Sequence, residues 1–266
     1  MLNILVCVKQ VPDIDLVRMD PETGNLVRTG VPSLMNPLDT NALEAAIRTK
    51  EQYGGTVTAI TMGPPAAEAV LREALSVGAD RAILASGREF GGADTLSTSY
   101  VLVQTAKQFG DYDLIFCGKE STDGATGQMG SQLAERFDAA QVSSLYIIES
   151  IDEAEKKVVA KRELPEGIET IEATIPCLFT VEKTNYPARI PNLKGYLASK
   201  KAEIIVLGPK DFKDLDIQKA GVPGSGTIVP KIYPPELPEA GQILDEGDVK
   251  LTVEKLVGIL ADDGRI

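Results

Sequence analysis

The sequence contains no histidine and no tryptophan, and it has only three cysteines among its 266 residues. Histidine is the commonest general base and metal ligand, and Ser-His and Cys-His nucleophilic arrangements require it. Its absence argues against hydrolytic chemistry. If the protein takes part in a reaction, we expect the chemistry to lie in a bound organic cofactor, with the protein supplying position and electrostatics. No side chain of this chain is expected to be catalytic itself.

The three cysteines are far apart and lack C-x-x-C spacing; they are Cys7, Cys117 and Cys177. Zinc and iron–sulfur sites draw on closely spaced cysteines, so neither kind of metal site is predicted. We expect all three to be buried, reduced thiols.

Basic residues are few relative to acidic ones, 27 against 39, which gives a formal net charge of -12. Such a surface repels nucleic acid and anionic membranes, so the expected partners are proteins or small molecules. Long apolar runs are also missing, since none approaches the roughly 20 residues of a membrane span. Residues 1–3 lead into an apolar run without the basic region of a signal peptide. We therefore expect a cytoplasmic protein without membrane insertion.

Short apolar runs alternate with segments of helical periodicity in the first half of the chain. The runs typical of strands buried on both faces of a sheet are residues 2–9, 56–62, 81–85 and 114–117. Helical spacing of apolar residues occupies 39–51, 66–77 and 94–109. The alternation predicts a doubly wound α/β domain with a mostly parallel sheet. In such domains ligands bind beyond the carboxyl ends of the strands.

Further strands are predicted at 141–149, 157–163 and 169–174, and we expect them to extend the same sheet. Between the first strand and the first helix lies an insert of about residues 13–30. Turn residues at 20–25 predict that this insert is a hairpin.

The composition changes near residue 209, where glycine and proline become frequent before a final helical pattern at 251–260. We therefore expect an α/β nucleotide-binding domain over 1–208 and a C-terminal arm over 209–266. The arm has little core of its own, which favours its packing against another subunit. The alternative is that its helix folds back on its own domain.

A glycine-rich turn, residues 118–128, separates the apolar run 114–117 from a helix-like segment at 129–137. Gly124 and Gly127 let the backbone approach an anion, and a helix N-terminus supplies free amides and partial positive charge. The Walker pattern is absent because Lys119 follows the first glycine directly. The turn therefore favours holding a nucleotide over cleaving a triphosphate. A tight turn without a ligand is the alternative.

Several separated motifs together resemble one known family. The motifs are residues 6–13, the Asn-Pro segment 35–39, the loop 123–128, the segment 159–176 with Glu169 and Thr180, and Ile190-Pro191-Asn192 followed by Lys200-Lys201. In this order they resemble the electron transfer flavoprotein beta subunit family over nearly the whole chain. The resemblance implies a Rossmann-like or HUP-like nucleotide-binding fold.

The resemblance also implies a heterodimer with an alpha subunit, whose FAD lies near the subunit interface, and an adenine nucleotide in the beta subunit. In most members that nucleotide is structural AMP. In electron-bifurcating members it is a second FAD that accepts hydride from NADH. The polar segment 88–99 resembles the flavin-side loop of the bifurcating kind. An AMP-holding carrier and a non-redox nucleotide-binding module are the alternatives.

The positions that match the family's cofactor contacts fall into three groups. The adenosine group is Cys7, Asn36 and Met62, and Asp39 and Gly63 are further expected cofactor positions. The phosphate loop is Asp123, Gly124, Ala125, Thr126, Gly127 and Gln128. The flavin-side group is Phe90, Asp94 and Thr95. Asn36 and Asp94 could instead only cap helices. A carboxylate repels phosphate, so Asp123 is expected to accept hydrogen bonds from loop amides or a ribose hydroxyl.

The family's partners include an acyl-CoA dehydrogenase-type flavoenzyme, and a ferredoxin or flavodoxin is a further acceptor in bifurcating members. Ile190 matches the segment that recognises partner dehydrogenases. One aliphatic side chain that enters a pocket can dominate a transient interface. The alternative is that Ile190 belongs to the core.

Overall fold

The computed structural model describes residues 1–13, 18–19, 26–27, 31–182, 187–230 and 241–266. The chain divides into two compact units, Met1–Pro230 and Lys231–Ile266. The division lies beyond the expected boundary at 208/209, because residues 209–230 pack on the α/β unit.

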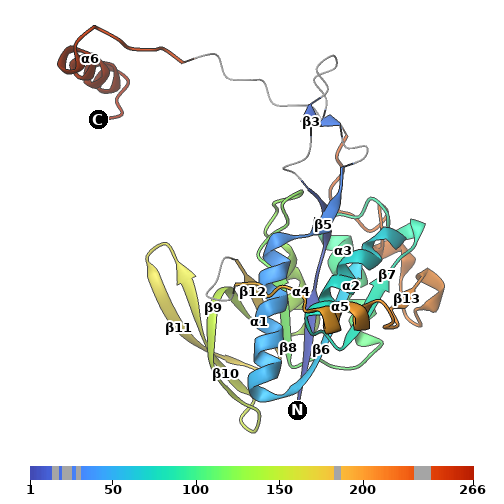
Figure 1. Cartoon of the computed structure of the whole chain (residues 1–266). Coiled ribbons are helices and arrows are strands. Elements are labelled where there is room, and N and C mark those ends of the chain that lie inside the picture. The colour runs from blue at the N-terminus through green and yellow to red at the C-terminus, as the bar shows by residue number, and fades with distance from the viewer. Residues whose placement is uncertain (14–17, 20–25, 28–30, 183–186, 231–240) are drawn as a thin grey trace. The chain divides into compact units, whose positions relative to one another are not determined.

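A nine-stranded sheet forms the centre of the first unit, in the order β11-β10-β9-β12-β8-β1-β6-β7-β13 (Figure 1). The strands from β9 to β13 in this order are parallel, and β10 runs antiparallel to both β9 and β11. The parallel strands that were predicted are β1 (Leu2–Cys7), β6 (Gly55–Met62), β7 (Arg81–Ala85) and β8 (Leu114–Gly118). The extending strands are β9 (Ala140–Asp152), β10 (Lys157–Leu164) and β11 (Gly167–Thr174). The predicted fold class is thus confirmed.

Two strands of the sheet were not predicted. They are β12 (Cys177–Val181) and β13 (Ile205–Leu207). The five residues of β12 are all buried, so this strand completes the core between β8 and β9. A short apolar run after Pro176 was its only sequence signal.

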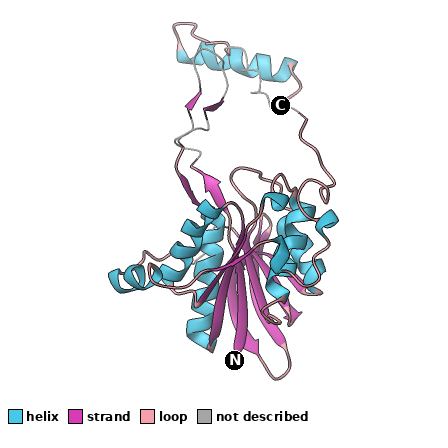
Figure 2. Ribbon diagram, turned by 90° about the vertical axis from the view of Figure 1, so that its right-hand side faces the viewer, coloured by secondary structure: helices cyan, strands magenta, loops and turns pink. Residues whose placement is uncertain are grey.

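Helices cover both faces of the sheet (Figure 2). On one face α1 (Pro37–Tyr53) and α2 (Glu68–Val77) pack on Leu2, Ile4 and Val6. On the other, α3 (Thr95–Lys107) and α4 (Met129–Phe137) pack on Leu5 and Cys7. Side chains of β1 alternate between the faces, as the strand period of two requires. The helix α5 (Leu193–Ser199) packs against α2.

The insert after β1 contains two antiparallel strand pairs. The inner pair is β2 (Gln10–Pro12) with β5 (Ser33–Met35), and the outer pair is β3 (Arg18–Met19) with β4 (Leu26–Val27). Antiparallel pairing of this kind is what the hairpin prediction requires. The predicted turn at 20–25 lies outside the described residues.

Residues 209–230 are attached to the first unit by specific contacts. The Asp216 amide donates to the Tyr100 hydroxyl at 2.8 Å, and the Phe90 and Phe212 rings meet edge to face. This segment contains two short 3-10 turns, η4 (Pro209–Asp211) and η5 (Ile217–Lys219); two others, η2 (Pro65–Ala67) and η3 (Arg88–Phe90), precede α2 and α3.

The second unit contains the predicted helix, α6 (Val249–Asp262), which Asp248 caps by accepting from the amides of Lys250 and Leu251. Apolar residues of α6 are exposed within this unit, including Leu251, Val253 and Val257. That the arm packs on another subunit stays a prediction. In the part of the chain that the structure describes, no helix is long and apolar enough to pass through a bilayer.

Candidate functional site

A cavity of about 570 Å³ lies beyond the carboxyl ends of β1, β6 and β8, where the doubly wound topology predicts a ligand site. Its walls come from the ends of these strands, the N-termini of α1 and α4, and the loop before α3. Thr227, from the segment after η5, completes the wall. The volume lies in the range of about 300–1,000 Å³ that is usual for small-molecule sites.

Asp39 joins two strand ends under this cavity. Its carboxylate accepts from the backbone amides of Lys9 at 2.8 Å and Gly118 at 2.9 Å. A Cβ at Gly118 would lie 2.4 Å from Asp39 Oδ1, so only glycine permits this approach. Burial raises the pKa of Asp39 to about 7, although its hydrogen bonds and the Lys9 charge oppose the rise.

The buried side chain of Asn36 fixes the glycine-rich loop. Its Nδ2 donates to the Glu120 carbonyl at 2.8 Å, and its Oδ1 accepts from the Thr122 amide at 3.2 Å. The side chain makes no cap hydrogen bond to α1. The helix-cap alternative for Asn36 is therefore wrong, and its polar atoms hold the loop beside the cavity.

Gly130 allows α4 to begin close to the sheet. A Cβ at this position would lie 2.2 Å from Thr180 Cγ2 and 3.5 Å from Cys117 Sγ. The preceding loop turns through positive φ at Ala125 and Gly127. None of the described side chains caps α4, so its first amides are available to a ligand in the cavity.

Lys9 brings a positive charge to the cavity wall. Its ammonium contacts both Asp123 carboxylate oxygens, at 2.6 and 2.8 Å, and the Ser121 hydroxyl at 3.3 Å. Burial would raise the pKa of Asp123, but Lys9 and Ser121 outweigh burial and lower it. Asp123 thus pairs with Lys9, a partner that the sequence did not indicate. The pair forms because the topology brings the end of β1 beside this loop. Hydrogen bonds of Asp123 to loop amides or a ribose hydroxyl stay a prediction.

Asp94 connects the loop before α3 to the segment after η5. Oδ1 accepts from the Ser97 amide at 3.0 Å, which caps α3. Oδ2 accepts from the Gly226 amide, the Thr227 amide and the Thr227 hydroxyl at 2.8–3.0 Å. Asp94 thus caps α3, and the same carboxylate also places Thr227 at the cavity wall, so capping is not its only role; its contact with a cofactor stays a prediction.

Thr95 links the same loop to α4. Its hydroxyl donates to Gln128 Oε1 at 3.0 Å and accepts from Gln132 Nε2 at 3.2 Å. The glycine-rich loop before α4 and the loop before α3 are therefore held to each other across one wall.

The family is decided by comparison with known proteins. The electron transfer flavoprotein domain family matches residues 23–211. The electron transfer flavoprotein subunit beta of Thermoanaerobacterium thermosaccharolyticum is 43% identical over 257 residues, covering 96% of each chain. The chain belongs to the electron transfer flavoprotein beta subunit family.

Two further relatives are similar to this chain over most of its length. Subunit CarD of the caffeyl-CoA reductase-Etf complex of Acetobacterium woodii is 38% identical over 262 residues, 98% of each chain. Protein FixA of Azorhizobium caulinodans is 39% identical over 238 residues, which cover 88% of this chain and 85% of FixA. Beta subunits of this family pair with an alpha subunit and hold FAD or AMP.

Eleven of the fourteen predicted cofactor positions of this beta subunit line the one cavity. They are Cys7, Asn36, Asp39, Met62, Phe90, Asp94, Thr95, Gly124, Thr126, Gly127 and Gln128. The other three, Gly63, Asp123 and Ala125, are not among the lining residues. Contact of the eleven with a cofactor stays a prediction. Fourteen further lining residues were not among the predicted contacts, and Lys9 and Thr227 are two of them. Lys9 could have been found from its place after β1, whereas nothing in the sequence pointed to Thr227.

The three cysteines of the beta subunit are buried free thiols, as expected. Cys7 and Cys117 lie opposite each other on β1 and β8 at the floor of the cavity. Burial raises the pKa of both thiols, which keeps them protonated.

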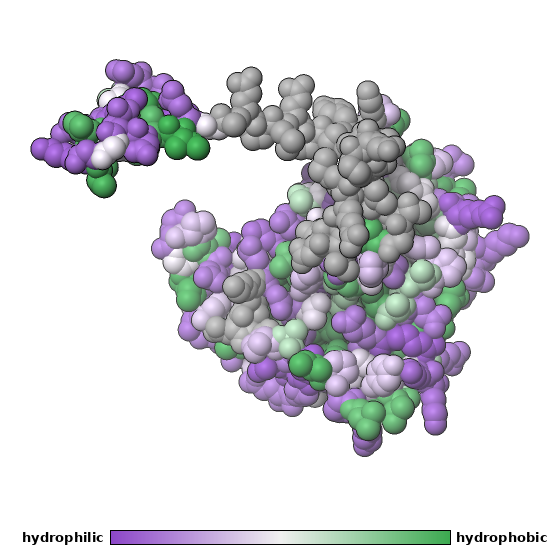
Figure 3. Space-filling view, turned by 45° about the horizontal axis from the view of Figure 1, so that its top comes forward, coloured by the Kyte–Doolittle hydropathy of each residue, from purple (hydrophilic) through white to green (hydrophobic). Residues whose placement is uncertain are grey.

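Ile190 is not among the residues that line the cavity, and its side chain is 88% exposed. The alternative that Ile190 belongs to the core is therefore wrong for the unit Met1–Pro230. Three further exposed apolar residues follow it on α5, namely Leu193, Tyr196 and Leu197. Figure 3 shows a surface on which hydrophilic residues predominate, with separate hydrophobic groups between them. An apolar cluster on such an acidic protein is typical of an interaction site.

Asp39 gives this beta subunit a testable pH dependence. Its pKa is about 7 in the folded protein and near 3.8 in an unfolded chain, so between these values only the folded state binds the proton. The free energy of unfolding is therefore expected to fall as the pH rises from about 4 to about 7, by up to about 1.4 kcal/mol per pH unit. Urea titrations at several pH values measure this slope.

Because the chain has no histidine, no other side chain has an ordinary pKa in the upper part of this window. Asp39→Asn should therefore flatten the slope between pH 5 and 7. An equal slope in the variant would assign the titration to another group.

Proposed function

We propose that this beta subunit binds FAD in the cavity and NADH beside it, and that it works in flavin-based electron bifurcation. With the alpha-subunit FAD, it passes electrons to an acyl-CoA dehydrogenase-type flavoenzyme and to a ferredoxin or flavodoxin. The activity belongs to the alpha–beta complex, and the proposed setting is the cytoplasm. FAD, when bound, supplies the hydride-accepting and electron-transferring chemistry.

The observation that carries this proposal is the extent of the cavity. It continues from the adenosine end, at Cys7 and Asn36, past the glycine-rich loop to the flavin-side loop, where Phe90, Asp94 and Thr95 line it. A site for AMP alone does not need the flavin-side wall. The relative CarD, named as part of a caffeyl-CoA reductase-Etf complex, supports the same proposal.

The chain's residues fit a dinucleotide diphosphate. Met129 at the start of α4 lines the cavity and no described side chain caps this helix, so its first amides can donate to the diphosphate; each hydrogen bond to a charged oxygen contributes roughly 1.5–3 kcal/mol. Lys9 lines the same cavity, but Asp123 balances its charge. The net charge of -12 acts mostly from a distance and is screened over about 8–10 Å at ordinary ionic strength. A few local donors therefore outweigh the overall charge.

The FAD to AMP ratio of the purified alpha–beta complex tests the proposal. We expect two FAD and no AMP per heterodimer after denaturation and chromatography, with excess FAD supplied during purification to replace lost flavin. One FAD and one AMP would favour the single-flavin carrier. A complex without flavin absorbance would favour the non-redox module.

Ile190 is proposed as the anchor for the dehydrogenase. Truncation of a central aliphatic anchor removes about 1.4–2 kcal/mol of binding energy or more, which is tenfold to thirtyfold in affinity. Ile190→Ala is therefore expected to raise the KM for the dehydrogenase at least tenfold without changing flavin content.

The matched control for this substitution is Ile168→Ala on β11, where the side chain is also exposed, at 54%. Ile168→Ala should leave the KM unchanged. Equal effects of the two variants would contradict a specific anchor at Ile190.

A further inference from the structure

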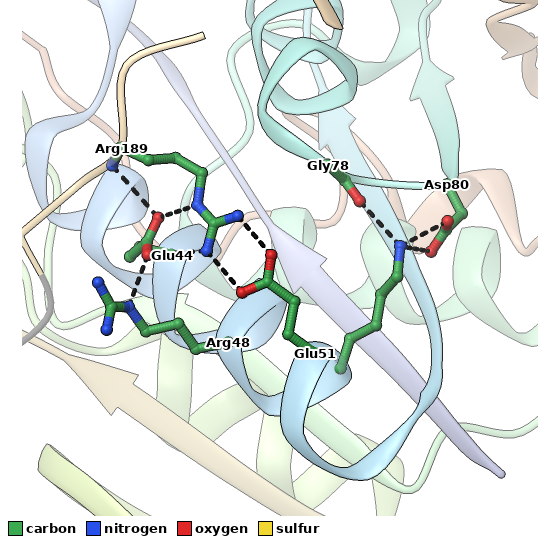
Figure 4. A network of polar contacts seen from close by, with 7 residues as sticks. Glu44, Arg48, Glu51, Gly78, Asp80 and Arg189 are labelled. Atoms are coloured by element: carbon green, nitrogen blue, oxygen red, sulfur yellow. Dashed lines mark hydrogen bonds and ion pairs between the residues drawn. The ribbon is translucent and has the colours of Figure 1, made fainter. Parts of the chain in front are cut away.

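Arg189, the residue before Ile190, is held by two carboxylates of α1 (Figure 4). Its Nε and Nη2 donate to the two oxygens of Glu44 at 2.7 and 3.0 Å. Its Nη1 and Nη2 donate to the two oxygens of Glu51 at 2.6 and 2.9 Å. The Arg189 backbone amide also donates to Glu44 at 3.2 Å. Side chain and main chain of Arg189 are thus both attached to α1.

We call the arrangement of Arg189 between Glu44 and Glu51 the clamp. Its Glu44 side is buried, whereas Glu51 is exposed. The Glu44 side chain is only 2% exposed, and Arg48 donates to it as well, at 2.6 Å. Burial would raise the pKa of Glu44, but Arg189 and Arg48 outweigh it and hold the carboxylate ionised. The planar guanidinium makes two parallel hydrogen bonds to each carboxylate, which the point charge of lysine cannot reproduce.

The chain is fixed again directly after Ile190. Pro191 restricts the backbone, and Asn192 caps α5 by accepting from the Gly195 amide at 2.8 Å. A Cβ at Gly195 would lie 2.2 Å from the Ser76 carbonyl, so α5 rests closely on the end of α2. Ile190 is therefore exposed while the chain on both sides of it is anchored.

The other end of α5 is also tied to α2. Arg72 donates to the carbonyls of Ser199 and Ala202 at 2.5 and 2.7 Å. Exposed basic residues lie on this helix and directly after it, namely Lys194, Lys200 and Lys201. On a chain of net charge -12, this local positive charge suits a partner whose apolar pocket has an acidic rim.

We propose that Arg189 is the positioning residue that holds Ile190 in its docking conformation for the dehydrogenase. The proposal rests on the proposed role of Ile190 and adds the device that orders it. A loop that is ordered before binding pays less conformational entropy when it binds, so the clamp strengthens docking without touching the partner.

The test uses the whole alpha–beta complex as electron acceptor for butyryl-CoA dehydrogenase, reduced with butyryl-CoA, with an indophenol dye as terminal oxidant. This direction of assay does not depend on bifurcation. Arg189→Lys is expected to raise the KM for the complex about tenfold, with kcat and flavin content unchanged. Hydrogen exchange of the amides at 188–195 should become faster.

Two comparisons separate positioning from general stability. Arg81→Lys, a change to an exposed arginine on β7, outside α1 and α5, should alter neither the KM nor the exchange. When Ile190 is already replaced by alanine, the further change Arg189→Lys should raise the KM by less than twofold. Glu51→Gln, which weakens the exposed half of the clamp, should give a smaller rise in the same direction.

The outcomes are distinguishable. If Ile190→Ala raises the KM but Arg189→Lys changes neither the KM nor the exchange, the positioning role is wrong and the anchor stands. If Ile190→Ala leaves the KM unchanged, the anchor itself is wrong, and the role of Arg189 in docking falls with it.

Discussion

Replacing Asp39 by alanine is expected to lower the free energy of unfolding by about 2–6 kcal/mol, because one buried and one partly buried amide lose their acceptor at about 1–3 kcal/mol each. These amides, of Lys9 and Gly118, end β1 and β8 beneath the cavity. The strand ends should separate once the carboxylate that joins them is gone. We therefore expect the variant complex to lose its nucleotide as well, measured by nucleotide content after denaturation and by urea unfolding.

A graded series makes this prediction specific. Asp39→Asn retains one carbonyl oxygen, so it should satisfy one of the two amides and cost about half as much. Asp111→Ala removes an exposed carboxylate outside the site and should change unfolding by less than about 0.5 kcal/mol. If Asp39→Ala kept full stability and full nucleotide content, the buried carboxylate would not be the joint between the two strands.

Gly130→Ala is expected to have the second largest effect. The added Cβ would lie 2.2 Å from Thr180 Cγ2, so α4 or β12 must move. Thr180 cannot simply rotate, because its hydroxyl accepts from the Ser144 amide at 3.1 Å and its side chain is buried. Overpacking of this kind costs about 1–3 kcal/mol. Displacement of the α4 amides should also reduce nucleotide content.

Adding Thr180→Ser to the Gly130→Ala variant should restore both the free energy of unfolding and the nucleotide content. It removes the methyl group that collides with the new Cβ and keeps the hydroxyl for Ser144. As a matched control, Gly258→Ala adds a Cβ to a helix glycine with open space around it, in α6, and should stabilise that helix by about 1 kcal/mol without affecting nucleotide content. Failure of Thr180→Ser to rescue Gly130→Ala would show that the loss arises elsewhere.

Much of the fold could be predicted because its strands are long enough to carry a pattern. The runs that became β1, β6, β7 and β8 are apolar on both faces, as central parallel strands require. The strand β13 has three residues and only partial burial, so its sequence carries no periodicity that distinguishes it from a loop. It is a strand because β7 offers it an open edge.

The parts of the site that are contiguous in sequence could be predicted, whereas contacts between residues far apart in sequence could not. The glycine-rich loop and the start of α4 are contiguous, so their pattern was visible in the sequence. The clamp between Arg189 and Glu44 joins residues 145 positions apart, and Asp94 and Thr227 are 133 apart. The sequence offered local interpretations for such residues, a helix cap for Asp94 and loop amides or a ribose for Asp123, because only local partners are visible in it.

The sequence by itself determined the α/β class, the glycine-rich turn between β8 and α4, the net acidic charge and the absence of histidine, because each depends on composition or on neighbours along the chain. Only the tertiary structure decided which charges meet. Lys9 pairs with Asp123, Asp39 joins two strand ends, and Ile190 is exposed, since hydrogen bonds and burial depend on distances in space that the folded sheet sets.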